Sequence, residues 1–93
     1  MDRYQTQFEI IYAQTIHTGI IRPLQKGWVT SYLVTLKGAG NEAKPDILFN
    51  PSASLMKDWD TTCNGEEAVI HYDKALLDEI GEQIAVRLIK NAI

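Results

Sequence analysis

The chain has 93 residues, of which 45% are apolar, 23% charged and 9% aromatic, and its formal net charge is −3. This length and composition predict one globular domain spanning residues 1–93. The negative charge argues against direct binding of nucleic acid, which usually requires a basic surface. The single cysteine excludes an intrachain disulfide, a paired-cysteine redox motif and a multi-cysteine zinc site.

No secretory signal pattern opens the sequence, and no apolar run approaches the roughly 18 residues that span a bilayer. The single cysteine also indicates a reducing, intracellular environment, because extracellular domains of this size usually carry paired cysteines. We therefore expect a cytoplasmic protein, in the host cytoplasm if it is viral, with no membrane partner.

The N-terminal segment, residues 4–16, alternates apolar and polar residues. This period of two, rich in β-branched and aromatic residues, predicts a half-buried strand. The alternative is a helix with Asp2 as N-cap and Gly19 as C-cap, because several apolar residues also fit a 3.6-residue period.

The middle of the chain predicts two strands separated by connections. Residues 19–27 contain a proline and are expected to form a connection, and residues 28–37 form a strand with apolar residues on both faces. Such a strand belongs in the centre of a sheet. Residues 38–45 have the composition of a loop. Residues 47–49 predict a short strand that ends at the following Asn-Pro pair.

Asn64 and Gly65 are the strongest local signal, because Asn-Gly favours a type I′ turn between two antiparallel strands. A two-residue loop here predicts three cross-strand pairs: Cys63 with Glu66, Trp59 with Ile70, and Asp58 with His71. The same register predicts one core face, made of Trp59, Thr61, Cys63, Ala68, Ile70 and Tyr72. The opposite face would be acidic and solvated.

The C-terminal segment, residues 74–92, predicts an amphipathic helix with Asp73 as N-cap. Its apolar stripe is formed by Leu77, Ile80, Ile84 and Leu88. Gly81 lies within this stripe and would allow close packing on a sheet. Together the elements predict an α+β fold, an antiparallel sheet of about four to five strands covered on one face by a C-terminal helix.

Residue patterns that carry chemistry are scarce. Cys63 and His71 would point to opposite faces of the hairpin, so they form no nucleophilic dyad. His71 opposite Asp58 is better explained by a cross-strand ion pair than by a metal site. Phosphate-binding and nucleophile-elbow motifs are absent from the sequence. We therefore expect no enzyme, no catalytic residue, no metal and no cofactor.

Acidic residues are concentrated in one part of the chain. Residues 57–82 hold eight acidic and two basic residues, a local net charge of −6. Such a patch attracts and steers a basic surface. The side chains expected to contact that partner are Asp58, Asp60, Glu67, Asp78, Glu79 and Glu82.

The end of the predicted helix is apolar on nearly every side. Val86, Ile89 and Ile93 point away from the core stripe, and burial of each such side chain is worth about 1.5–3 kcal/mol. We expect them to contact an oligomeric copy or another partner, which leaves a homodimer open.

The first functional hypothesis is a non-catalytic inhibitor that occupies the nucleic-acid-binding surface of a basic target protein. Phage anti-defence proteins of the anti-CRISPR kind and toxin-immunity proteins act in this way. The alternative is a structural subunit of a homo-oligomeric or phage-particle assembly. A third hypothesis, nucleic-acid binding by an aromatic sheet face, is disfavoured by the net negative charge.

Overall fold

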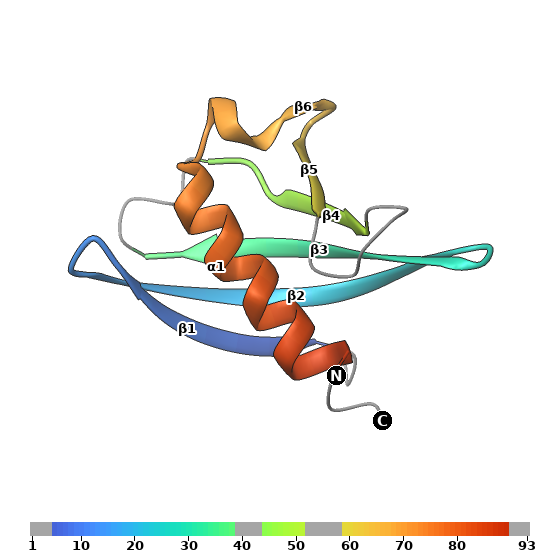
Figure 1. Cartoon of the computed structure of the whole chain (residues 1–93), viewed down its shortest axis with the longest axis horizontal. Coiled ribbons are helices and arrows are strands. Elements are labelled where there is room, and N and C mark those ends of the chain that lie inside the picture. The colour runs from blue at the N-terminus through green and yellow to red at the C-terminus, as the bar shows by residue number, and fades with distance from the viewer. Residues whose placement is uncertain (1–4, 39–43, 52–58, 90–93) are drawn as a thin grey trace.

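The computed structural model describes residues 5–38, 44–51 and 59–89. Six strands form one antiparallel sheet in which each strand lies beside its neighbour in sequence, and helix α1 crosses one face of that sheet (Figure 1). The elements are β1 (Thr6–Tyr12), β2 (Thr15–Lys26), β3 (Val29–Lys37), β4 (Ile47–Pro51), β5 (Trp59–Cys63), β6 (Glu66–Glu67), the 3-10 turn η1 (Ala68–Ile70), α1 (Lys74–Ile84) and the π-helical turn η2 (Ala85–Ile89). The α+β prediction is confirmed, with more strands than expected. None of the described helices is long and apolar enough to cross a bilayer.

The N-terminal segment is a strand rather than a helix, but it contains a turn that the prediction missed. β1 ends at Tyr12, and Thr15 lies directly opposite it at the start of β2. The two residues between them, Ala13 and Gln14, have φ angles of +52° and +63°. Positive φ at both positions defines a type I′ turn, which normally requires Asn or Gly. The Ala-Gln pair therefore gives no turn signal in the sequence.

The connection expected at residues 19–27 is wrong, because β2 continues through this segment to Lys26. Pro23 lies opposite Tyr32 of β3. Antiparallel pairs alternate between hydrogen-bonded and non-hydrogen-bonded positions, and this pair is non-hydrogen-bonded, so the β2 residue donates no backbone hydrogen bond to β3. The described pairing of β1 with β2 has already ended at Ile21, so the missing N–H of Pro23 breaks no bond there.

β3 is central, as predicted, although it begins one residue later than expected. A two-residue turn formed by Gly27 and Trp28 joins it to β2. Gly27 has a φ of +61°, and a glycine with positive φ in this position is typical of a type II′ turn. Trp28 therefore lies at the tip of the hairpin, where its side chain is fully exposed.

The Asn64-Gly65 turn and the pairing of Cys63 with Glu66 are confirmed, since the two turn residues have φ angles of +51° and +84°. The predicted register extends one pair further, to Thr62 with Glu67, and three residues of the predicted core face are buried: Cys63, Ala68 and Tyr72. The hairpin is nevertheless shorter than predicted, because β6 ends at Glu67. Trp59 pairs with Pro51 of β4 instead of Ile70.

The turn η1 explains why the hairpin is short. The carbonyl of Ala68 accepts the N–H groups of His71 and Tyr72, both at 2.9 Å, and this turns the chain away from β5. Ile70 is consequently 64% exposed, which corrects its placement in the core. His71 lies beyond the end of β6, and its predicted partner, Asp58, lies outside the described residues.

The core lies between α1 and the sheet. The helical stripe is confirmed: Leu77, Ile80 and Ile84 are buried, and Leu88 packs partly buried against them. The α-helix itself ends at Ile84 and continues as the π-helical turn η2, which ends at Ile89.

Asp73 occupies the predicted N-cap position of α1, but its side chain makes no capping hydrogen bond. Its Oδ2 instead accepts a hydrogen bond of 3.0 Å from the hydroxyl of Tyr12. This contact ties the end of β1 to the beginning of the helix.

Candidate functional site: an acidic groove

A groove of about 780 Å³ lies between α1 and the β5–β6 end of the sheet. It is lined by Trp59, Asp60, Thr61, Thr62, Glu67, Val69, Lys74, Leu77, Asp78, Gly81, Glu82 and Ala85. We call it the acidic groove, because four of these side chains are carboxylates and one is a lysine.

The groove brings together four of the six acidic residues singled out in the sequence. Asp60 and Glu67 come from the sheet, and Asp78 and Glu82 come from α1. All four are exposed to solvent. Glu79 is also exposed on α1 but does not line the groove, and Asp58 lies outside the described residues.

One of the four carboxylates is already paired. The Nζ of Lys74 lies 3.0 Å from Oδ1 of Asp78, in an i, i+4 arrangement on the helix surface. Among the described residues, Asp60, Glu67 and Glu82 have no ion-pair partner. These three carboxylates come from both walls of the groove.

The apolar side chains that line the groove include Trp59 and Leu77. The indole makes edge-to-face contacts with Tyr32 and Phe49, at ring-centroid distances of 5.8 and 5.9 Å. On the helix side, a Cβ added to Gly81 would lie 2.6 Å from Cδ1 of Trp59. The absence of a side chain at Gly81 therefore allows α1 to approach the indole closely.

Comparison of the chain with known protein families, characterised proteins and solved structures gave no match.

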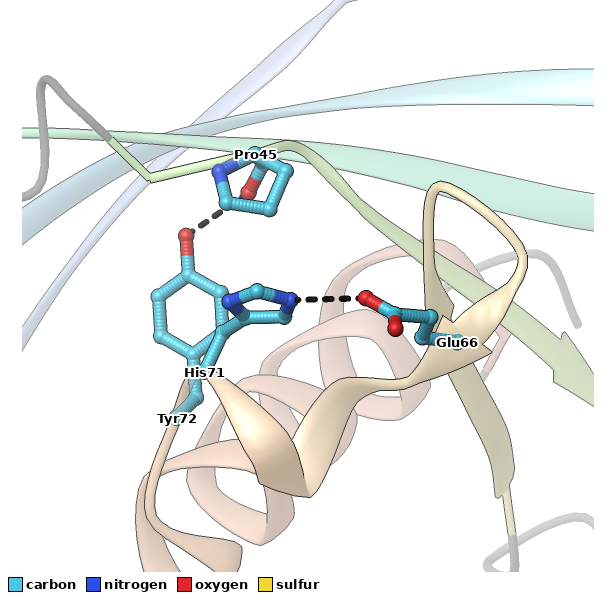
Figure 2. Close-up of polar contacts among 4 residues, drawn as sticks. All are labelled: Pro45, Glu66, His71 and Tyr72. Carbon is cyan, nitrogen blue, oxygen red and sulfur yellow. Dashed lines mark hydrogen bonds and ion pairs between the residues drawn. The ribbon is translucent and has the colours of Figure 1, made fainter.

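The two residues considered for a nucleophilic dyad, Cys63 and His71, lie in different surroundings, since Cys63 is buried and His71 is near Glu66. Nε2 of His71 lies 3.5 Å from Oε1 of Glu66, a contact drawn as a dashed line in Figure 2. Burial raises the pKa of the Cys63 thiol, and the carboxylates of Asp46 and Glu66 raise it further. A raised pKa keeps the thiol protonated, whereas a nucleophile requires the thiolate.

Tyr72 joins the end of η1 to the sheet. Its hydroxyl donates a 2.8 Å hydrogen bond to the carbonyl of Pro45, as Figure 2 shows. Burial, together with smaller contributions from Cys63 and Asp46, raises the pKa of Tyr72 to about 12. Within the described ranges, no three His, Cys, Asp or Glu side chains come together as a metal site.

Of the three apolar residues expected to make an oligomer contact, the structure describes the exposure of Val86 alone. Val86 is 39% exposed on η2. Ile89 ends the same turn, but the description does not extend to its side chain, and Ile93 lies outside the described residues. Sequence reasoning missed another apolar pair, Ile11 and Ile16, which lie opposite each other and are 73% and 55% exposed. The alternation of residues 4–16 places Ile11 on the solvent-facing side of the predicted strand. Its pairing with Ile16 could not be predicted, because the turn at Ala13 and Gln14 has no sequence signal.

Proposed function

We propose that this chain is a non-catalytic protein-binding module whose acidic groove contacts a basic surface on another protein. That surface would be one that otherwise binds nucleic acid, so the module would act as an inhibitor by occupying it. The observation that carries this proposal is the gathering of four carboxylates and one lysine around one groove that is also lined by Trp59 and Leu77.

Both parts of the groove contribute to such a contact. Carboxylates at the rim accelerate encounter with a basic partner and select against acidic ones. The apolar side chains that line the groove, Trp59 and Leu77 among them, supply the surface whose burial stabilises the complex. Tryptophan is among the residues that most often dominate the energy of an interface.

A matched pair of double variants tests the proposal. Asp60→Asn/Glu82→Gln removes one unpaired carboxylate from each wall of the groove and leaves the Lys74–Asp78 pair intact. The control, Glu9→Gln/Asp46→Asn, removes the same charge from exposed positions outside the groove.

Wild type and both variants would be immobilised and exposed to a cell extract that has been cleared of nucleic acid by nuclease. We expect a basic protein to bind wild type and the control, and to bind the groove variant about tenfold more weakly or worse. An oligonucleotide bound by that protein should compete with wild type, and added salt should weaken the complex. The proposal is wrong if the groove variant captures the same proteins as wild type, or if the oligonucleotide and this chain bind the partner together.

A second candidate function is that of a subunit in a homo-oligomeric assembly. It is supported by Ile11 and Ile16, which form an exposed apolar pair at one end of the sheet. Light scattering on a sizing column at low and high salt tests it. A stable oligomer at both salts that Ile11→Thr/Ile16→Thr dissociates would support assembly, and a monomer at both salts would contradict it.

A further inference from the structure

We propose that the acidic groove takes up an extended basic peptide segment, which adds as a strand to the outer edge of β5. This inference rests on the proposed function and deepens it, because it specifies the form of the partner as well as its charge. It is based on the position of one edge of β5 inside the groove.

Four consecutive residues of β5, from Trp59 to Thr62, line the groove. Side chains of successive strand residues point to opposite faces, so a groove over one face would meet only alternate residues. Lining by consecutive residues means that the groove runs along an edge of the strand. The other edge of β5 is paired with β4 along the same four residues. The edge that lies in the groove is therefore the outer one, next to β6.

That outer edge loses its strand partner before it ends. β6 pairs only with Thr62 and Cys63. In a hairpin with a two-residue turn, the closing residues exchange both backbone hydrogen bonds, so the N–H of Cys63 points toward β6. By alternation, the N–H groups of Thr61 and Trp59 point the same way.

The next residue along the chain does not replace the missing partner. Ala68 would continue the ladder opposite Thr61, but its carbonyl already accepts the N–H groups of His71 and Tyr72. A carbonyl oxygen has two lone pairs, and both are used. Among the described residues, the sheet therefore provides no acceptor on this edge for the N–H groups of Thr61 and Trp59, which a strand entering the groove could supply.

The size and charge of the groove select the ligand. The helix wall extends from Lys74 to Ala85, a length of about 16 Å at the rise of an α-helix. An extended peptide of about five residues has this length. The carboxylates of the groove would attract basic side chains on the added strand, whereas an acidic segment would be repelled.

The probe is a blocked hexapeptide of alternating lysine and valine, and the readout is hydrogen exchange of individual backbone amides by NMR. At saturation we expect exchange of the Trp59 and Thr61 amides to slow by at least about tenfold, because they gain acceptors. The amide of Trp28, at the distant turn, should not change. A fully N-methylated peptide of equal charge should bind at least about tenfold more weakly, because it has no backbone donors.

The outcomes separate the two proposals. If the hexapeptide binds wild type but not Asp60→Asn/Glu82→Gln, and yet the two amides exchange as before, strand addition is refuted and the acidic contact stands. If the N-methylated peptide binds as tightly as its parent, strand addition is refuted as well. If the hexapeptide binds the groove variant as tightly as wild type, the proposed function fails together with the inference. Circular dichroism of the variant confirms that it is folded.

Discussion

Replacement of Gly81 by alanine tests the packing of α1 against Trp59 in the groove. Alanine is the better helix former, and in the interior of α1 it would contribute about 0.8–1 kcal/mol of stability. Its Cβ, however, would lie 2.6 Å from Cδ1 and 2.8 Å from Nε1 of Trp59. Real contacts are longer, so the indole or the helix must move.

The indole has little freedom to move, because Tyr32 and Phe49 contact it edge-on. Forcing one additional carbon into such a contact costs about 1–3 kcal/mol. Setting this against the gain in helix propensity, we expect Gly81→Ala to destabilise the protein by about 1 kcal/mol. In a domain of this length that corresponds to a fall in Tm of about 4–8 °C.

A double-mutant cycle with Trp59→Leu gives the clearer test, because Gly81→Ala should destabilise the wild-type protein but stabilise the Trp59→Leu variant. Without the indole, Gly81→Ala should stabilise by about 1 kcal/mol, which is the propensity gain alone. Urea unfolding followed by far-ultraviolet circular dichroism measures all four proteins. If Gly81→Ala stabilises both backgrounds equally, the two positions are not coupled and the indole does not restrict residue 81.

Three further predictions follow from the core. Gly19→Ala places a Cβ 2.5 Å from the ring of the buried Phe8, so it should lower the free energy of unfolding by about 1–3 kcal/mol. Urea unfolding measures this change, and an unchanged midpoint would mean that the ring can move aside. Tyr72 has an ordinary pKa of 10 when unfolded and about 12 when folded, so its contribution to stability is complete below pH 10 and is lost as pH rises through about 12. Tyr72→Phe should therefore flatten the alkaline fall in unfolding free energy, and an equally steep fall in the variant would contradict this. The buried Cys63 thiol should react with a thiol reagent only when the fold opens. Gly19→Ala destabilises the fold and should therefore accelerate this labelling. Equal labelling rates in wild type and variant would indicate that the thiol is accessible without unfolding.

Turn chemistry determined how much of the fold could be predicted. Asn64-Gly65 forms the turn that its residues favour, whereas Ala13 and Gln14 adopt the same positive φ angles without a sequence signal. Gly27 marks a genuine turn, but Pro23, which suggested a connection, lies inside β2. Tertiary pairing along a long hairpin outweighs the local preference of a single proline where no donor is needed.

The groove could be anticipated only in part. The clustering of acid along the chain was visible, and the structure places Asp60, Glu67, Asp78 and Glu82 around one groove. What the sequence did not reveal is that β6 stops after two residues. That ending depends on the hydrogen bonds of the Ala68 carbonyl, which no periodicity encodes. It exposes the edge of β5 in a groove that both acidic and apolar side chains line.

The most direct test of the central claim, that the acidic groove receives a basic ligand, uses the two tryptophans of the chain as reporters. Trp59 lines the groove, and Trp28 is fully exposed at the tip of the β2–β3 hairpin. Their indole N–H signals would be followed by NMR during titration with the lysine–valine hexapeptide at low salt. The account predicts that the Trp59 signal shifts saturably, returns when salt is added, and leaves the Trp28 signal in place. A shift of the Trp28 signal alone, or equal shifts of both, would contradict it.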